Sequence, residues 1–184
     1  MAQQPRDESD AEPKLSFLEQ KQAARCAGMD FLARREHSRH ELFLKLGRKF
    51  PAFEPDAINE TLDQLIADKL LSNERFTTSY INSRKNKCYG YLYIRQALRD
   101  RRVPETLIDL HLFPDDEAWM QILSSFVDRK IDRKVDRTSD TEPNSGPRLE
   151  FAGKAHRRLV RLLQSRGFTP AEIGRALKPW LGQT

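Results

Sequence analysis

The sequence predicts an all-α protein made of three tandem three-helix repeats of a helix-turn-helix-like kind. The main observation is that residues 93–112 and residues 158–177 share one apolar pattern when they are aligned without a gap. The chain also lacks convincing runs in which apolar and polar residues alternate, as they do in half-buried strands. Five pairs of apolar residues coincide in the alignment: Ile94 with Leu159, Leu98 with Leu163, Val103 with Phe168, Ile108 with Ile173, and Leu112 with Leu177.

The composition fits small helical units with much exposed surface better than one deep core. Of the 184 residues, 38% are hydrophobic and 32% are charged, whereas an average globular domain has about 45–50% apolar and about 25% charged residues. Repeats of about 40–50 residues bury too little surface to be stable alone, so we expect each to pack against its neighbours. The formal net charge of +5 and the isoelectric point of about 9.3 favour an anionic partner.

Composition and periodicity divide the chain into a tail and three repeats. The first fourteen residues hold four acidic and two basic side chains and no aromatic residue, which is typical of disorder. Within the third repeat we expect a flexible loop over 132–147, which holds Ser, Thr, Pro and Gly and has no apolar periodicity apart from Val135. The expected segments are a disordered acidic tail over 1–14 and helical repeats over 15–71, 72–113 and 114–184.

In the first repeat, polar caps predict where two helices begin. Ser16 and Glu19 have the spacing of a capping box, in which each side chain accepts a hydrogen bond from the other residue's backbone N–H. Ser38 and Glu41 have the same spacing. A third helix is predicted from Asp56 to residue 71, with an apolar stripe of Ile58, Leu62, Leu65, Ile66 and Leu70. A looser copy of the repeated pattern is formed by Leu42, Leu46, Phe50, Ile58 and Leu62.

The second and third repeats each begin with a helix ahead of the shared pattern. A helix over 74–87 is predicted to turn Phe76, Tyr80 and Ile81 inward, and the chain then turns at Gly90. A helix over 116–131 is predicted to have an inner face of Trp119, Ile122, Leu123 and Phe126. The last helix of the third repeat has strong start signals, namely Thr169 as cap, Pro170 in the first turn and Glu172 at the third position.

Several stretches resemble the RecX family of small bacterial regulators of the recombinase RecA. In order, they are "FLARREHSRHELFLKL", "NERFTTSYINSRKNKCYGYLYIRQALRDRRV", "FVDRKI" and "RLVRLLQSRGFTPAEIGRAL". The resemblance covers roughly residues 20–180, and its middle block is the most specific part. Two departures stand out. The family usually has Gly-Pro followed by basic residues where this chain has Gly90, Tyr91, Leu92 and Tyr93, and it usually has Gly where this chain has Arg102.

The resemblance implies a non-enzymatic protein whose three repeats form an elongated, curved arrangement. It also implies binding to the RecA–DNA filament, along its helical groove, with inhibition of ATPase activity and strand exchange, and a place in recombination, DNA repair and the SOS response. Members of the family bind single- and double-stranded DNA, so these are the expected partners beside RecA. We expect a cytoplasmic monomer without a cofactor, a metal ion or a membrane span.

The residues themselves point to two basic faces. Residues 84–102 carry seven basic side chains and one acidic side chain, interleaved with Tyr89, Tyr91 and Tyr93. Basic groups neutralise phosphates, and aromatic rings can stack on unpaired bases. Arg95, Arg99 and Arg102 are spaced as one stripe on a helix, and so are Lys154, Arg158 and Arg161. The candidate RecA- or DNA-binding residues are therefore Arg84, Lys85, Lys87, Tyr89, Arg95, Arg99, Arg102, Lys154, Arg158 and Arg161.

Other readings remain open at this point. Each basic stripe could be a solvated helix face, and the residues do not decide whether a stripe contacts RecA or DNA. A stand-alone DNA-binding protein, either a nucleoid or a transcription factor, is the main alternative. Sequence-specific reading by the helices after each turn is disfavoured, because "PAEIGRALKP" and "PETLIDLHLF" offer few base-reading side chains. Surface or capping histidines are expected, and Cys26 and Cys88 are expected in or near the core rather than as nucleophiles.

Overall fold

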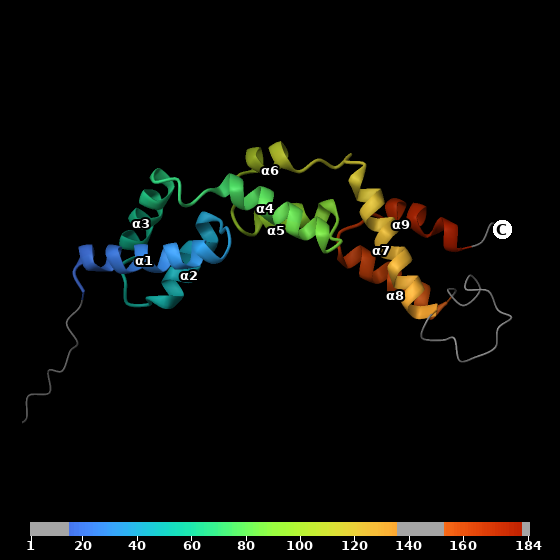
Figure 1. The fold of residues 1–184 in the computed structure, drawn as a ribbon, viewed down its shortest axis with the longest axis horizontal. Helices are drawn as coiled ribbons and strands as arrows, with labels where there is room; N and C mark the ends of the chain where they lie inside the picture. Colours follow the sequence, from blue (N-terminus) through green and yellow to red (C-terminus); the bar gives the residue numbers. More distant parts are fainter. Residues whose placement is uncertain (1–14, 136–152, 182–184) are drawn as a thin grey trace, which may run out of the picture. The chain divides into compact units, whose positions relative to one another are not determined.

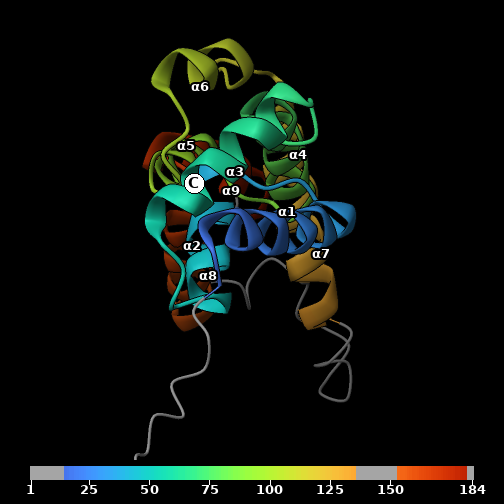
Figure 2. The ribbon, with the colours of Figure 1, turned by 90° about the vertical axis from the view of Figure 1, so that its left-hand side faces the viewer.

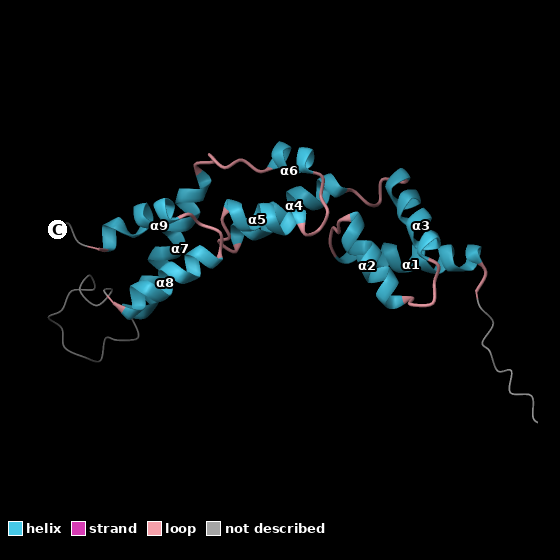
Figure 3. Ribbon diagram, turned by 180° about the vertical axis from the view of Figure 1, so that it is seen from behind, coloured by secondary structure: helices cyan, strands magenta, loops and turns pink. Residues whose placement is uncertain are grey.

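The computed structural model describes residues 15–135 and 153–181, and every regular element in these ranges is helical (Figure 3). Nine α-helices and one short 3-10 helix follow one another along the described chain, without a strand (Figure 1). The chain divides into two compact units, of which the first ends at Ser72 and the second begins at Asn73. The predicted all-α fold built of three-helix repeats is therefore confirmed.

The first unit contains one three-helix repeat. Its helices are α1 (Phe17–Arg34), α2 (Arg39–Lys49) and α3 (Pro55–Ala67), and Figure 2 shows them packed against one another in blue to teal. The apolar residues of the looser repeat copy are buried in this core, except Phe50, which is half-buried and packs against it. The buried core consists of Ala27, Leu42, Leu46, Ile58, Leu62, Leu65 and Leu71.

The predicted caps hold the first two helices at their starts. The hydroxyl of Ser16 accepts the N–H of Glu19 at 3.3 Å, and the Glu19 carboxylate accepts the N–H of Ser16 at 2.8 Å. These two bonds complete the capping box and satisfy two donors that the first turn leaves without helical partners. At α2, the hydroxyl of Ser38 accepts the N–H of Glu41 at 3.1 Å.

The third helix is shorter than the sequence predicts. It ends at Ala67, and Lys69 then takes a left-handed conformation with φ of 59°. The N–H groups of Lys69 and Leu70 bond back to the carbonyls of Ile66 and Leu65, both at 2.9 Å, as in a Schellman turn. Two residues were wrongly predicted as core, because Ile66 within α3 and Leu70 within this turn are exposed, while Leu71 is buried.

The second unit contains the other two repeats. Its helices are α4 (Asn73–Asn86), α5 (Tyr91–Arg99), α6 (Glu105–His111), α7 (Ala118–Val135), α8 (Lys154–Ser165) and α9 (Pro170–Leu177), followed by the 3-10 helix η1 (Lys178–Trp180). The predicted start of α9 is confirmed, because Thr169 and Glu172 form a capping box and Pro170 occupies the first turn.

The apolar pattern that the two repeats share is also their shared core. All ten coincident residues are buried, none of them more than 8% exposed. Those of the second repeat pack with Phe76, Tyr80 and Ile81 of α4, which confirms the predicted inner face of that helix. Those of the third repeat pack with Leu123 of α7. One short pattern therefore produces two equivalent hydrophobic cores.

Helix α7 serves both cores and extends further than predicted. Trp119 near its start packs into the second repeat's core, while Leu123 and Val127 pack into the third. Ile122 and Phe126, which were expected on the inner face, are half-buried. Since the helix continues to Val135, the first four residues of the predicted loop 132–147 are helical. The rest of that loop and the predicted tail over 1–14 lie outside the described residues.

The second and third repeats are joined through close backbone contacts. The N–H of Gly90 donates to the carbonyl of Arg166 at 2.7 Å. A Cβ on Gly90 would lie 2.6 Å from the carbonyl oxygen of Gly167, and one on Gly167 would lie 2.3 Å from the nitrogen of Tyr93. Such distances exclude any side chain larger than hydrogen, so the two glycines allow the two backbones to meet.

Candidate nucleic-acid interface

The cationic row predicted on the third repeat is exposed along α8. Lys154, Arg158 and Arg161 lie on successive turns, all three are exposed, and none has a bonded or ion-paired partner among the described residues. Leu159 and Leu163, on another face of the helix, are buried in the core, so the three cations point to solvent. Three cations on one exposed helix face can neutralise regularly spaced phosphates.

The middle stripe has a different environment, because its two helical arginines are neutralised within the repeat. Arg95 donates to Asp109 and to Glu105, both at 2.7 Å. Arg99 donates to both carboxylate oxygens of Glu105, at 2.5 and 3.1 Å. The bond from Arg99 is the main reason that the pKa of Glu105 is lowered. These four side chains therefore tie α5 to α6, an arrangement that the spacing along one helix does not reveal.

The third member of the middle stripe, Arg102, remains exposed. Its φ of 53° places it in the left-handed region after α5, at the position equivalent to Gly167 after α8, where φ is 83°. The N–H of Arg102 donates to the carbonyl of Arg99 at 2.8 Å. The glycine expected there from the family pattern would suit this conformation better than arginine does.

The basic residues at the end of α4 divide into packed and exposed ones. The Arg84 guanidinium lies over the rings of Tyr80 and Tyr89, at 4.7 and 5.6 Å from their centroids. The Lys85 ammonium bonds to the carboxylate of Asp116 at 2.5 Å and lies 4.5 Å from the Trp119 ring.

These packed contacts hold α4 to its neighbours in the second unit. By contrast, the side chain of Lys87 is exposed.

The three tyrosines also have partners inside the second unit. The rings of Tyr89 and Tyr93 stack with centroids 4.3 Å apart, and the Arg166 guanidinium lies 4.9 Å from the Tyr89 centroid. The hydroxyl of Tyr91 accepts a hydrogen bond from Arg95 at 2.7 Å. Within the second unit, the Tyr89 ring therefore already contacts one aromatic ring and two guanidinium groups.

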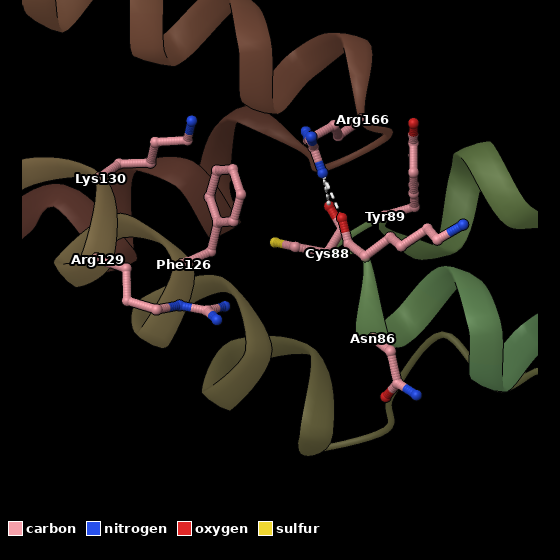
Figure 4. Close-up of a pocket in the computed structure, with 8 residues that line it drawn as sticks. Asn86, Cys88, Tyr89, Phe126, Arg129, Lys130 and Arg166 are labelled. Atoms are coloured by element: carbon pink, nitrogen blue, oxygen red, sulfur yellow. Dashed lines mark hydrogen bonds between the residues drawn. The ribbon is translucent and has the colours of Figure 1, made fainter. Parts of the chain in front are cut away.

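A cavity of about 360 Å³ lies where the second and third repeats meet (Figure 4). It is lined by Lys87 from the turn after α4, by Arg129 and Lys130 from α7, and by Arg166 after α8. The last three of these were not among the predicted site residues. Their signal in the sequence was weak, because Arg129 and Lys130 lie within the family-like "FVDRKI" block, far from residue 87.

The two cysteines differ in their exposure. Cys26 is exposed, contrary to the prediction, whereas Cys88 is buried as predicted. Burial raises the pKa of the Cys88 thiol to about 11, which opposes a nucleophilic role. No group of His, Cys, Asp and Glu suited to a metal ion occurs in the described parts of the chain. None of the described helices is both long and apolar enough to cross a membrane.

Comparison with known proteins identifies the repeats. Residues 24–65 match the first three-helix domain of RecX, and residues 72–112 match the second. A regulatory protein RecX from Pseudomonas fluorescens strain Pf-5 is 33% identical over 145 residues, which cover 79% of this chain and 92% of that protein. One from Halorhodospira halophila is 30% identical, over 83% of this chain and 84% of the relative.

Solved structures show the same fold. The crystal structure of RecX from Lactobacillus salivarius superposes with a TM-score of 0.59 at 15% identity, over 89% of this chain and 97% of that one. Another, of a regulatory protein RecX, has a TM-score of 0.64 at 18% identity and covers 88% of this chain and 74% of that one. The sequence matches, together with these repeats, show that the chain belongs to the RecX family of regulatory proteins.

Proposed function

We propose that the protein binds the RecA–DNA nucleoprotein filament and inhibits RecA ATPase activity, strand exchange and recombination. Its place among regulatory RecX proteins supports this role. The observation that carries the proposal is the exposed row of Lys154, Arg158 and Arg161 on α8, which lacks a carboxylate partner among the described residues.

The proposed mechanism is occupancy of the filament groove. Contacts to phosphates orient a protein without reading base sequence, so repeated basic faces suit a regular filament better than a unique site. A protein lying in the groove would block entry of a second DNA strand. It would also hinder the motions of RecA that accompany ATP hydrolysis.

Within this proposal the candidate residues have two roles. The α8 row makes the first contact, and the exposed side chains of Lys87 and Arg102 extend the contact onto the second repeat. The other candidates support the shape of the second unit, because their charged or aromatic groups already have partners there: Arg84, Lys85, Tyr89, Arg95 and Arg99.

The test is the ATPase rate of RecA assembled on single-stranded DNA, titrated with this protein at fixed salt. We expect inhibition at far fewer copies of this protein than of RecA, and no relief by excess DNA. Inhibition that requires coating of the DNA and disappears with excess DNA would instead identify a stand-alone DNA-binding protein.

A pair of charge-matched variants tests the α8 row itself. Arg158→Glu with Arg161→Glu should raise the inhibitory concentration at least about tenfold, because each lost charge-assisted hydrogen bond is worth about 1.5–3 kcal/mol. The control, Arg175→Glu with Lys178→Glu, changes the net charge equally at exposed positions of the same repeat. Equal effects of the two pairs would show that only net charge matters and would refute a specific α8 contact.

A further inference from the structure

All charged residues that line the cavity between the second and third repeats are positively charged. Four of its lining residues are cationic, namely Lys87, Arg129, Lys130 and Arg166, and none is acidic. In Figure 4, Arg129 and Arg166 approach it from opposite sides, with the Phe126 ring and the Cys88 thiol between them. Residues from the end of α4, from α7 and from the turn after α8, all in the second unit, therefore surround one cavity.

The charges of this wall are not balanced by the described part of the protein. Arg166 donates to the main-chain carbonyls of Lys87 and Cys88, and Arg129 donates to the carbonyl of Ser125 at 3.1 Å. The Lys130 ammonium lies 5.5 Å from the centroid of the Phe126 ring. Neutral carbonyls and a ring orient these groups, but no described carboxylate pairs with any of them.

Two further observations concern the guanidinium groups of this wall. The Nε of Arg166 is buried without a hydrogen-bond partner among the described residues, which is unfavourable for a charged donor. Burial raises the pKa of Cys88, while Arg166 and then Arg129 act in the opposite direction on the same thiol. The positive charges of both guanidinium groups therefore act on the same thiol.

We propose that this cavity binds a phosphate group, which bridges Arg129 and Lys130 of α7 to Arg166 and Lys87. Arginine forks match the oxygens of a phosphate and can bind it through two parallel bonds. The volume of about 360 Å³ leaves room beside the phosphate for the group that it esterifies. The source is either the backbone of a nucleic acid or a free phosphate compound, and the chemistry of recognition is the same.

A bound phosphate would join the second repeat to the third. Gly90 and Arg166 already connect them through one backbone hydrogen bond of 2.7 Å, and the anion would add ionic contacts from both sides. Phosphate binding at this cavity does not require RecA, and it does not depend on the proposed inhibition. Its test therefore contains no RecA.

The experiment titrates the full-length protein with inorganic phosphate, with a 5′-mononucleotide and with a short single-stranded oligonucleotide at fixed ionic strength. Backbone amide signals in NMR spectra map the site, and calorimetry gives the affinity. We expect at least one probe to shift the amides of residues 86–89 and 126–130. Tighter binding of the oligonucleotide than of the small probes identifies the backbone as the source, and the reverse order identifies a free phosphate compound.

Variants decide whether the cavity is the site. Arg129→Gln with Lys130→Gln should weaken binding at the cavity about tenfold or more, the effect of losing one charge-assisted hydrogen bond. Arg175→Gln with Lys178→Gln removes the same charge outside the cavity and should leave that binding unchanged. Absence of shifts at residues 86–89 and 126–130 with all three probes would overturn the proposal, and so would equal affinities of the two variants. The shifts on the unaltered protein decide the matter even if a variant fails to fold.

Discussion

Arg95 and Glu105 form an ion pair of 2.7 Å that ties α5 to α6. The same carboxylate receives Arg99, and Asp109 provides a second partner for Arg95. Two of the three cations in the predicted middle stripe therefore form ion pairs within the repeat. Charge reversal at these positions therefore acts on the stability of the repeat as well as on any partner.

Arg95→Glu with Arg99→Glu should lower the midpoint of urea unfolding. The substitutions remove the pairs to Glu105 and Asp109 and place four carboxylates together, which repel one another. Urea titrations followed by circular dichroism measure this loss. The control is Arg158→Glu with Arg161→Glu, whose cations have no described partners, so its midpoint should stay near that of the unaltered protein. A smaller loss for the α5 pair than for the α8 pair would contradict this account.

His37 should make the first repeat less stable in mild acid. Its ring is buried, with Nδ1 donating to the carbonyl of Arg35 at 2.9 Å and Nε2 accepting from the Lys45 ammonium at 2.8 Å. Burial, assisted by the charges of Arg35 and Lys45, lowers the pKa of His37, while Glu41 and the Arg35 carbonyl oppose the shift. Its stabilising contribution is therefore complete above the unfolded-state pKa of about 6.5 and declines as the pH falls toward the lowered folded-state value.

Urea unfolding between pH 7.5 and pH 5 measures this dependence. His37→Gln should flatten the pH profile in that range. The matched control, His40→Gln, lies three residues away on α2 and should retain the profile of the unaltered protein. An unchanged slope in His37→Gln would show that other groups carry the dependence.

Arg102→Gly should stabilise the second repeat by about 1 kcal/mol, because the left-handed conformation costs an L-residue roughly 1–2 kcal/mol and glycine much less. Arg102 adopts this left-handed conformation, with φ of 53°. Arg102→Ala is the control, since it removes the same charge but keeps a Cβ. Chemical denaturation should rank the glycine variant above the alanine variant, and the opposite order would refute the strain.

Gly167→Ala should destabilise the second unit by about 2 kcal/mol or more, as overpacking and left-handed strain add. The new Cβ would meet the backbone of Tyr93 at 2.3 Å, and φ is 83°. Gly174→Ala is the matched control within the same repeat, because nothing lies within 4 Å of its Cβ. It should be neutral or stabilising by about 0.5–1 kcal/mol, since alanine favours the helix. Thermal or urea unfolding of both variants gives the comparison.

Much of the helical architecture could be predicted from the sequence. Capping residues such as Ser16 and Thr169 bond to backbone groups three residues away, so their effect is local and readable. The shared apolar pattern is also local, because helical geometry alone places Leu159 and Leu163 on one face. The α8 row beside them is exposed for the same reason. One wrong prediction arose where the chain leaves the helical path, at Lys69, after which Leu71 and not Leu70 is buried. Others, such as Ile66, lie within a helix on a face that the neighbouring helices leave exposed.

The amino-acid sequence by itself determined most of the helices, most of the faces that they bury and the membership of the RecX family. Only the tertiary structure decided which cations are exposed and which are paired. The spacing of charged residues along a helix predicts which face of that helix each one occupies. The partners of these residues lie on other helices, as Glu105 does for Arg99. The cavity also depends on contacts between residues that are far apart in the sequence. Arg166 donates a hydrogen bond to the main-chain carbonyl of Lys87, 79 positions away.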